Sequence, residues 1–211
     1  MIACVPLSGY IEVNCYLWVD DETKHGFLID PGAQGNELME LCREKGWIIE
    51  KILLTHGHFD HIGGIAAIRE KADIPVYIHE AGEAYLTDTH LNLSRYHGEE
   101  IIVHGAKHFQ DGDIFRLESN PKWQLQVIHT PGHTPDSVLL YNQRQGIAFS
   151  GDTIFKQAHG NDRFPGGDGK QLLQSIRERI LTLPDETVLY SGHSEPTTVG
   201  VEKRFYEEAK G

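Results

Sequence analysis

The sequence Thr-His-Gly-His-Phe-Asp-His spans residues 55–61 and follows directly on a mostly apolar run, residues 48–54. Such a run is typical of a buried strand, and loops at strand ends are where a rigid scaffold presents its chemistry. In an extended segment, side chains at positions i and i+2 project to the same side. His56 and His58 can therefore bind one metal ion together.

The second half of this stretch extends the set of metal donors. Asp60 and His61 are adjacent at the start of a predicted helix, so their side chains point in different directions and can reach a second ion a few ångströms away. Three imidazoles and a carboxylate within six residues suit zinc, iron or manganese. Asp60 alone could be a helix cap, but a cap does not require three histidines around it. We interpret the stretch as a metal-binding motif.

Three further ligand candidates share one local pattern. Each is directly preceded by glycine, and each comes at or just after the end of an apolar strand candidate: they are His133, Asp152 and His193. Glycine lets the backbone approach a site closely. A lone loop histidine is more often solvated than bound to metal, but together with residues 55–61 these positions predict one site built from four separated loops.

The rest of the chain alternates short apolar runs with stretches of helical periodicity. Strands are predicted at residues 2–6, 15–19, 26–29, 48–54, 75–78, 114–117, 123–128, 138–141, 146–149 and 187–190, and helices at 36–45, 62–72, 172–183 and 199–209. Clusters of strands with interspersed helices occur twice, which predicts an α/β fold of two packed sheets with helices outside. The length of 211 residues predicts a single domain, residues 1–211.

Composition argues against several classes of function. A net charge of −12 does not suit nucleic acid, which needs clustered Lys and Arg. No apolar run approaches the ~20 residues of a membrane helix, and no secretory signal is visible, so we expect a cytoplasmic protein without a membrane partner. The three cysteines cannot all pair within one chain, and we expect reduced, buried thiols at Cys4, Cys15 and Cys42.

Residues 55–61 resemble the signature T-H-x-H-x-D-H of the metallo-β-lactamase superfamily, and the later candidates match its His, Asp and His positions. The resemblance implies a four-layer αββα sandwich of two mixed β-sheets with helices on both outer faces. It also implies two divalent metal ions, with zinc expected and iron or manganese as alternatives. The implied ligands are His56, His58 and His133 for the first ion, Asp60, His61 and His193 for the second, and Asp152 as the bridge.

Asp30 opens an Asp-Pro-Gly turn. It resembles the buried acid that supports the metal ligands in this superfamily from behind. A simple turn residue is the alternative interpretation.

The C-terminal third is similar to the short glyoxalase II-like group, which hydrolyses acyl-glutathione thioesters. The similarity lies in residues 151–155 and 164–168. The chain departs from the group at 160–163, where it reads Gly-Asn-Asp-Arg instead of the common G-R-T-D, and at Asp136, where a glycine is common. Full-length glyoxalase II enzymes add a C-terminal helical region that supplies much of the glutathione site, and this sequence ends at Gly211, which leaves the thiol carrier open.

A pair of cations would lower the pKa of a shared water towards neutrality, and the resulting bridging hydroxide would attack the carbonyl carbon of a thioester. We expect Asp60 to orient this hydroxide while it binds a metal, and Asp152 to set the spacing of the two ions. These two carboxylates are the catalytic candidates.

Contacts to a small anionic thioester substrate are harder to assign. Arg163 and Lys203 are candidates for binding substrate carboxylates, with solvated surface roles as the alternative. Tyr85, Leu91 and Tyr96 lie in a polar stretch that could form a flap over the site, and core packing is the competing interpretation.

Other activities fit the same motif. A lactonase or another ester or amide hydrolase is the main alternative. A persulfide dioxygenase resembles this site but uses one iron on two histidines and an aspartate, and Gly63 and Gly64 after His61 look more like the hydrolases. A non-catalytic module is disfavoured because structural zinc sites are closed centres with four ligands. The sequence leaves the metal, the native acyl group and the oligomeric state open.

Overall fold

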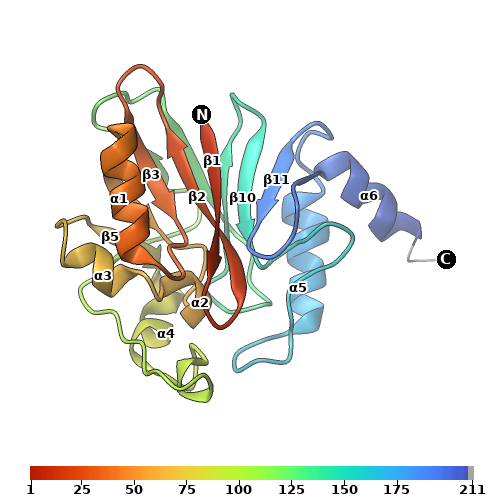
Figure 1. Ribbon diagram of the computed structural model, residues 1–211. Helices are drawn as coiled ribbons and strands as arrows, with labels where there is room; N and C mark the ends of the chain where they lie inside the picture. Colours follow the sequence, from red (N-terminus) through yellow and green to blue (C-terminus); the bar gives the residue numbers. More distant parts are fainter. Residues whose placement is uncertain (209–211) are drawn as a thin grey trace.

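Two six-stranded β-sheets lie face to face in the computed structural model, which describes residues 1–208 (Figure 1). In the first sheet the strands follow chain order, from β1 to β6. Strands β1, β2 and β3 pair antiparallel, and β3 then begins a parallel run that continues to β6, so the sheet is mixed. The strands are β1 (Ile2–Ser8), β2 (Glu12–Val19), β3 (His25–Ile29), β4 (Ile48–Leu53), β5 (Val76–His79) and β6 (Lys107–Phe109).

The second sheet runs in reverse chain order, from β12 to β7. Only β10 and β11 pair in parallel, and the other neighbours are antiparallel. Its strands are β7 (Ile114–Arg116), β8 (Gln124–His129), β9 (Val138–Asn142), β10 (Ile147–Gly151), β11 (Val188–Ser191) and β12 (Thr197–Thr198).

Helices cover both outer faces of this pair of sheets (Figure 1). The first sheet is covered by α1 (Gly35–Lys45) and α3 (Ile65–Arg69), and the second by α5 (Gly169–Ser175) and α6 (Val199–Glu208). The predicted αββα sandwich is therefore confirmed. Short helical turns lie near the lower end in Figure 1: α2 (Phe59–Ile62), η1 (Glu80–Gly82), α4 (Glu83–Thr87) and η2 (Ser94–Tyr96).

Strand β2 explains why the layers hold together. Alternate side chains of a strand project to opposite faces. Cys15 and Leu17 pack with α1 and α3, whereas Tyr16 and Trp18 pack between the two sheets. Because both faces are buried, the strand is an almost continuous apolar run rather than an alternating one.

Two predicted helices differ from the observed ones. The predicted helix at 62–72 is shorter in the structure, where α3 covers only residues 65–69. Residues 59–62 form the separate short helix α2, and between the two the Gly64 N–H donates to Pro31 O at 2.8 Å and so leaves the helical hydrogen-bond pattern. The predicted helix at 172–183 begins at Gly169 behind the N-cap Asp168, whose side chain accepts from Gln171 N, and it ends in the π-helical turn η3 (Ile176–Ile180). The last residue of the predicted helix at 199–209 lies outside the described residues.

The cysteines are unpaired, with Cys15 and Cys42 buried as predicted and Cys4 exposed, contrary to prediction. Strands β6 and β12 were not expected, because runs of two or three residues carry no periodic signal. Among the described residues, no helix has the length and apolar character needed to cross a membrane.

Candidate metal centre

All seven predicted ligands meet at one end of the two sheets, around α2 in the lower part of Figure 1. His56 and His58 follow β4, and Asp60 and His61 belong to α2. Because β10 and β11 are parallel, their carboxyl ends lie at the same edge of the sheet. The other three ligands lie in the loops after β8, β10 and β11: they are His133, Asp152 and His193.

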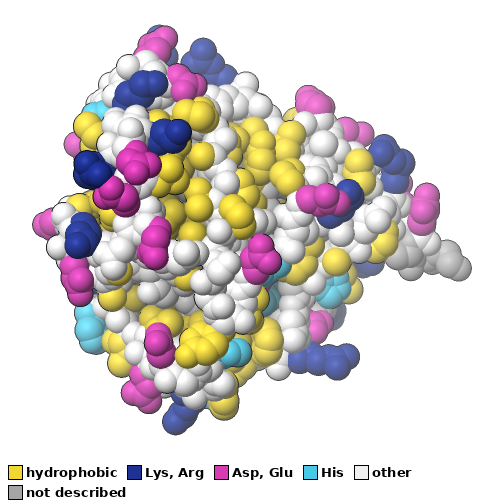
Figure 2. Space-filling view, viewed as in Figure 1, with side chains coloured by type: hydrophobic (Ala, Val, Ile, Leu, Met, Phe, Trp, Pro, Cys, Tyr) yellow, Lys and Arg dark blue, Asp and Glu magenta, His cyan; other side chains and the backbone are white. Residues whose placement is uncertain are grey.

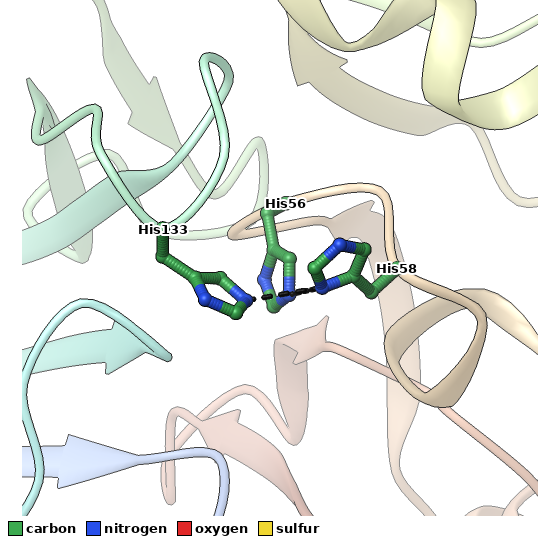
Figure 3. A group of neighbouring side chains, drawn as sticks. All are labelled: His56, His58 and His133. Atoms are coloured by element: carbon green, nitrogen blue, oxygen red, sulfur yellow. Dashed lines mark hydrogen bonds between the residues drawn. The ribbon is translucent and has the colours of Figure 1, made fainter. Parts of the chain in front are cut away.

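The first group consists of three imidazoles from two separate loops, which point toward one another (Figure 3). His58 Nδ1 lies 3.2 Å from His56 Nε2 and 3.0 Å from His133 Nε2. Nitrogens bound tetrahedrally to zinc at 2.0–2.1 Å would be about 3.3 Å apart. The three nitrogens are therefore spaced as the ligands of one ion would be.

Hydrogen bonds behind two imidazoles fix which nitrogen faces the site. His133 Nδ1 lies 2.8 Å from the Asn161 carbonyl oxygen, and His193 Nδ1 lies 2.7 Å from the Glu12 carbonyl oxygen. A carbonyl oxygen only accepts, so Nδ1 donates in both cases and Nε2 keeps its lone pair for a metal.

The second group combines two imidazoles and a carboxylate, Asp60, His61 and His193. Asp60 Oδ2 lies 3.1 Å from His193 Nε2 and 3.8 Å from His61 Nε2. This mixture of oxygen and nitrogen donors could bind a second ion. The carboxylate would give that ion a more anionic environment than the three imidazoles give the first.

Asp152 faces both groups. Its Oδ1 lies 3.4 Å from His61 Nε2, and its Oδ2 lies 3.3 Å from His193 Nε2 and 3.8 Å from His133 Nε2. His56, His61 and Asp152 form a further set of atoms close enough to share one ion. The residues thus fit a dinuclear metal site in which Asp152 lies between the two ions.

Unpaired polar atoms in this region support the same interpretation. His58 Nε2, His61 Nε2 and Asp152 Oδ1 are buried without a hydrogen-bond partner among the described residues. Buried polar groups in native proteins are nearly always paired, and each exception calls for a cause. Two of these three atoms face other candidate ligands, so a bound cation would satisfy them.

The imidazoles of the first group are neutral at neutral pH. Burial, with further contributions from neighbouring imidazoles, lowers the pKa of His58 to about 3 and that of His56 well below its ordinary value. Burial also lowers the pKa of His133. Three uncharged imidazoles can bind a cation without first losing a proton.

The imidazoles of the second group have the opposite tendency. Burial would lower the pKa of His193, but hydrogen bonds to Asp152 and Asp60 raise it to about 10. Burial would likewise lower the pKa of His61, but the carboxylates of Asp152, Asp30 and Asp60 raise it well above its ordinary value. Without metal, the neighbouring carboxylates therefore favour the protonated form of both imidazoles, and a cation entering this group must compete with protons.

Asp30 connects the two groups from behind. Its Oδ1 accepts from Thr55 N at 2.8 Å, and its Oδ2 accepts from the Thr55 hydroxyl at 2.6 Å and lies 3.0 Å from His61 Nδ1. The Thr55 hydroxyl oxygen in turn lies 3.2 Å from His56 Nδ1. One buried carboxylate thus contacts His61 directly and reaches His56 through a hydroxyl, and it also occupies a turn, with φ of 51°.

Two of the glycines that precede ligands are required by close approach. A Cβ at Gly192 would lie 2.3 Å from Asp152 Oδ1 and 2.8 Å from a carbon of the His61 ring. A Cβ at Gly151, where φ is +48°, would lie 2.2 Å from the Thr55 hydroxyl oxygen. Larger residues at these positions would displace a candidate ligand or the group that supports one.

Asp136 lies beside this site, at a position where the short glyoxalase II-like group commonly has glycine. Its carboxylate is buried, and burial raises its pKa to about 6. A Cβ at Gly82 would lie only 2.6 Å from its Oδ2, whereas a Cβ at Gly57, between His56 and His58, would lie 3.5 Å from the same atom. Gly82 thus leaves room for this carboxylate, which lies in van der Waals reach of the ligand loop.

A cavity of about 590 Å³ opens onto both groups of ligands. Its floor includes His58, Asp60, His133, Asp152 and His193. Its walls are mostly apolar or aromatic and comprise Ile11, Phe59, His90, Leu93, Tyr96, His97, Phe155, Asn161, Phe164 and Pro165. Of the three residues predicted to form a flap, Tyr96 lines this cavity, whereas Tyr85 is buried and its hydroxyl donates to Pro165 O.

The two predicted substrate-binding cations lie outside this cavity lining. Lys203 belongs to α6, where its Nζ binds Asp185 Oδ1 at 3.0 Å. Arg163 is exposed, and its backbone N–H donates to Asn161 Oδ1 at 2.9 Å. The structure brings neither side chain to the floor formed by the ligands.

Sequence reasoning missed the groups that orient His133 and His193. They are the backbone carbonyls of Asn161 and Glu12, and a backbone group leaves no mark on residue identity. Thr55 is different, because it stands inside the motif and its hydroxyl contacts both Asp30 and His56.

Comparison with known proteins agrees with this geometry. The family model described as the metallo-beta-lactamase superfamily matches residues 9–193. The chain belongs to the metallo-β-lactamase superfamily. Both the superfamily and the fold implied by the sequence resemblance are confirmed.

Relatives within the superfamily cover nearly the whole chain. YqgX of Bacillus subtilis, a probable metallo-hydrolase, is 39% identical over 196 residues, which are 92% of this chain and 91% of the relative. GloC of Haemophilus influenzae, a hydroxyacylglutathione hydrolase, is 30% identical over 206 residues, 96% and 95% of the two chains.

Two solved structures of the superfamily are similar throughout. The B3 metallo-beta-lactamase BLEG-1 has a TM-score of 0.89 and 38% identity, with 97% of each chain covered. TTHA1623, solved in a di-iron-bound form, has a TM-score of 0.84 and 36% identity, with 96% of this chain and 98% of that chain covered.

The first prediction concerns His58, whose Nδ1 contacts both other imidazoles of the first group. We expect His58→Ala to reduce the metal content of the purified protein from two ions per chain toward one. The loss of hydrolytic activity should exceed the ~10–100-fold typical of losing a group behind a ligand. Elemental analysis and steady-state assays measure both. His104→Ala, at an exposed histidine outside the three groups, is the matched control. Full metal content in His58→Ala would contradict the assignment.

The second prediction concerns Asp30. Asp30→Asn keeps the shape of the side chain but removes the charge beside His61 Nδ1. We expect metal affinity to fall ~10–100-fold, as is usual for a group that orients a ligand. Competition with a chromophoric chelator measures the affinity, and an unchanged affinity would reduce Asp30 to a turn residue.

The third prediction concerns the release of protons when each group binds its metal ion. At pH 7, filling the second group should release protons from His61 and His193, whereas filling the first should release almost none. The pKa of His193, about 10, lies above 7, so the metal affinity of the second group should fall as the pH decreases, by about tenfold per pH unit for each proton displaced. Calorimetric titration in buffers of different ionisation enthalpy measures this release. Equal release at the two steps would refute the charge assignment.

Proposed function

We propose that the protein is a dinuclear metal-dependent hydrolase that cleaves a small thioester, such as an acyl-glutathione, with zinc as the expected metal. The observation that carries this proposal is the set of seven donors in two groups with Asp152 between them. The similarity to the hydroxyacylglutathione hydrolase GloC supports the thioester, and the similarity to TTHA1623 in its di-iron-bound form keeps iron as an alternative metal.

The residues of the site have separate roles in the proposed hydrolysis. When bound, two divalent cations supply a water of lowered pKa and polarise the substrate carbonyl. Asp60 borders the cavity with its Oδ2 3.1 Å from His193 Nε2, so its carboxylate can orient the attacking water and accept its proton. Asp152, with one oxygen toward each imidazole of the second group, holds the two groups at a fixed spacing.

The leaving group explains why a thioester suits this site. A thiol has a pKa of about 8.5, so a thiolate leaves without prior protonation. Hydrolysis of a thioester therefore needs a nucleophile and a polarised carbonyl, and no separate general acid. An amide or an ester of an ordinary alcohol makes a stronger demand for protonation of the departing group.

A β-lactam amide is the second candidate substrate. The similarity to BLEG-1, whose structure is that of a B3 metallo-beta-lactamase, supports it, and a lactone would use the same nucleophile. A persulfide dioxygenase reaction has less support, because it requires one iron on two histidines and an aspartate, whereas this chain carries a second complete group of donors.

The fourth prediction tests the reaction directly. Protein purified without added metal is analysed for zinc, iron and manganese, and then assayed with a hydroxyacyl-glutathione, an S-acyl N-acetylcysteamine, a lactone and a β-lactam. We expect kcat/KM for a thioester to exceed that for the lactone and the β-lactam by at least ~10-fold, the discrimination that modest differences in transition-state binding give. His58→Ala and chelator-treated protein are the negative controls. Cleavage of the lactone or the β-lactam without cleavage of either thioester would overturn the proposal.

A further inference from the structure

The cavity above the ligands has two apolar walls that come from different parts of the chain. Leu93 and Tyr96, in and next to η2, form one wall. Phe155, Phe164 and Pro165, from the connection between β10 and α5, form the other. Both walls line the cavity onto which the candidate metal ligands open, so a substrate held in this cavity meets apolar surface.

The aromatic residues of the second wall stand directly beside ligands of both groups. The Phe164 ring centroid lies 5.7 Å from that of His58 and 6.4 Å from that of His133, and Phe155 lies 6.0 Å from His193. Aromatic surface therefore lies next to candidate ligands of both groups.

The first wall presents apolar surface because its polar atoms are already paired. The Tyr96 hydroxyl lies 2.6 Å from His90 Nδ1, so the pair satisfies itself and leaves the tyrosine ring as the contact surface. His97 stacks on Phe59 with ring centroids 4.3 Å apart and an interplanar angle of 21°. The imidazole faces on this side of the cavity are thus used in packing.

Much of this apolar surface is uncovered in the protein alone. Tyr96 is 62% exposed, Phe164 37% and Ile11 42%, and all three line the cavity. Figure 2 shows hydrophobic side chains and histidines next to one another on the lower part of the molecule. Exposed apolar surface gathered at one cleft is typical of a binding site, because covering it removes that surface from water.

The described lining of the cavity offers no basic side chain to a substrate carboxylate. No Lys or Arg is among the described residues that line the cavity, and the two carboxylates on its floor, Asp60 and Asp152, are candidate metal ligands whose charge bound cations would offset. Lys203, one of the two cations that the sequence suggested for binding substrate carboxylates, is paired with Asp185 on α6. Recognition at this cleft therefore relies on apolar contact rather than on ion pairs to the protein.

We propose that the enzyme selects thioesters that carry an apolar substituent, an aliphatic chain of about four or more carbons or an aromatic ring, held between the Leu93–Tyr96 wall and the Phe155–Phe164 wall. This inference rests on the proposed thioester hydrolysis and specifies its substrate class. The apolar group is on the acyl side or on the thiol side of the substrate, and a cavity of about 590 Å³ accommodates either.

The fifth prediction uses two series of thioesters. One series varies the acyl group, from acetyl through butyryl to hexanoyl and phenylacetyl, on N-acetylcysteamine. The other keeps the acetyl group and varies the thiol, from ethanethiol through butanethiol to hexanethiol, with glutathione as the anionic comparison. We expect kcat/KM to rise by about fourfold per added methylene in at least one series, the value for burying a methylene, until the walls are filled. A flat response in both series, or a preference for the glutathione thioester over the hexanethiol one without any acyl-chain effect, would overturn the inference.

Variants assign the preference to these walls. In Phe164→Ala and Tyr96→Ala we expect the ratio of kcat/KM for the preferred long substrate to that for its short counterpart to fall by at least ~10-fold. Both side chains are substantially exposed, so their truncation does not remove core packing. Ile48→Ala is the matched control, since Ile48 is 53% exposed at the start of β4, away from the ligand loops, and should leave the ratio unchanged. An unchanged ratio in both wall variants would also overturn the inference.

A binding measurement separates failure of this inference from failure of the proposed reaction. Acetate, butyrate and hexanoate are titrated calorimetrically into the metal-loaded protein, with no turnover required. If no thioester is cleaved but hexanoate binds at least ~10-fold more tightly than acetate and Phe164→Ala removes the difference, the apolar cleft stands and the reaction assignment fails. Equal binding of the three carboxylates, together with a flat response in both thioester series, would reject the apolar cleft.

Discussion

The carboxylate of Asp152 lies among three imidazoles at the end of the two sheets, and the rest of the site depends on this contact. Its two oxygens lie 3.3–3.8 Å from nitrogens of His61, His193 and His133, and the residue is only 8% exposed. Burying ionisable groups is costly unless they are paired or bind a metal. The three neutral imidazoles of the first group and the three residues of the second group together provide donors for two cations. Binding of these cations would offset the free-energy cost of burying the carboxylates.

The backbone around this contact is shaped by how closely the ligand loops approach one another. Gly192 and Gly151 lie where any side chain would strike Asp152, His61 or Thr55. Asp30 adopts a left-handed conformation and thereby directs its carboxylate to Thr55 and His61. Strands buried on both faces, such as β2, give these loops a rigid base. The packing of the two sheets thus fixes the positions of the loops that carry the ligands.

The motif at residues 55–61 could be interpreted from the sequence because its spacing is local: extended residues two apart must face the same way, and His56 and His58 do. His133, Asp152 and His193 were predicted from their position after apolar strands. What depends on tertiary contact was not predictable. The carbonyls of Asn161 and Glu12 that orient two ligands have no side-chain signal. The helix predicted from residue 62 begins only at Ile65, after the contact of Gly64 with Pro31, and Lys203 is bound to Asp185 away from the cleft.

The central claim is that two cations bind side by side with Asp152 between them, and anomalous X-ray diffraction at the absorption edge of the bound metal tests it most directly. The account predicts two peaks about 3.5–4 Å apart, the spacing of two-metal hydrolytic sites. One peak should lie among His56, His58 and His133, and the other among Asp60, His61 and His193. A single peak, or peaks away from these residues in protein loaded to saturation, would contradict it.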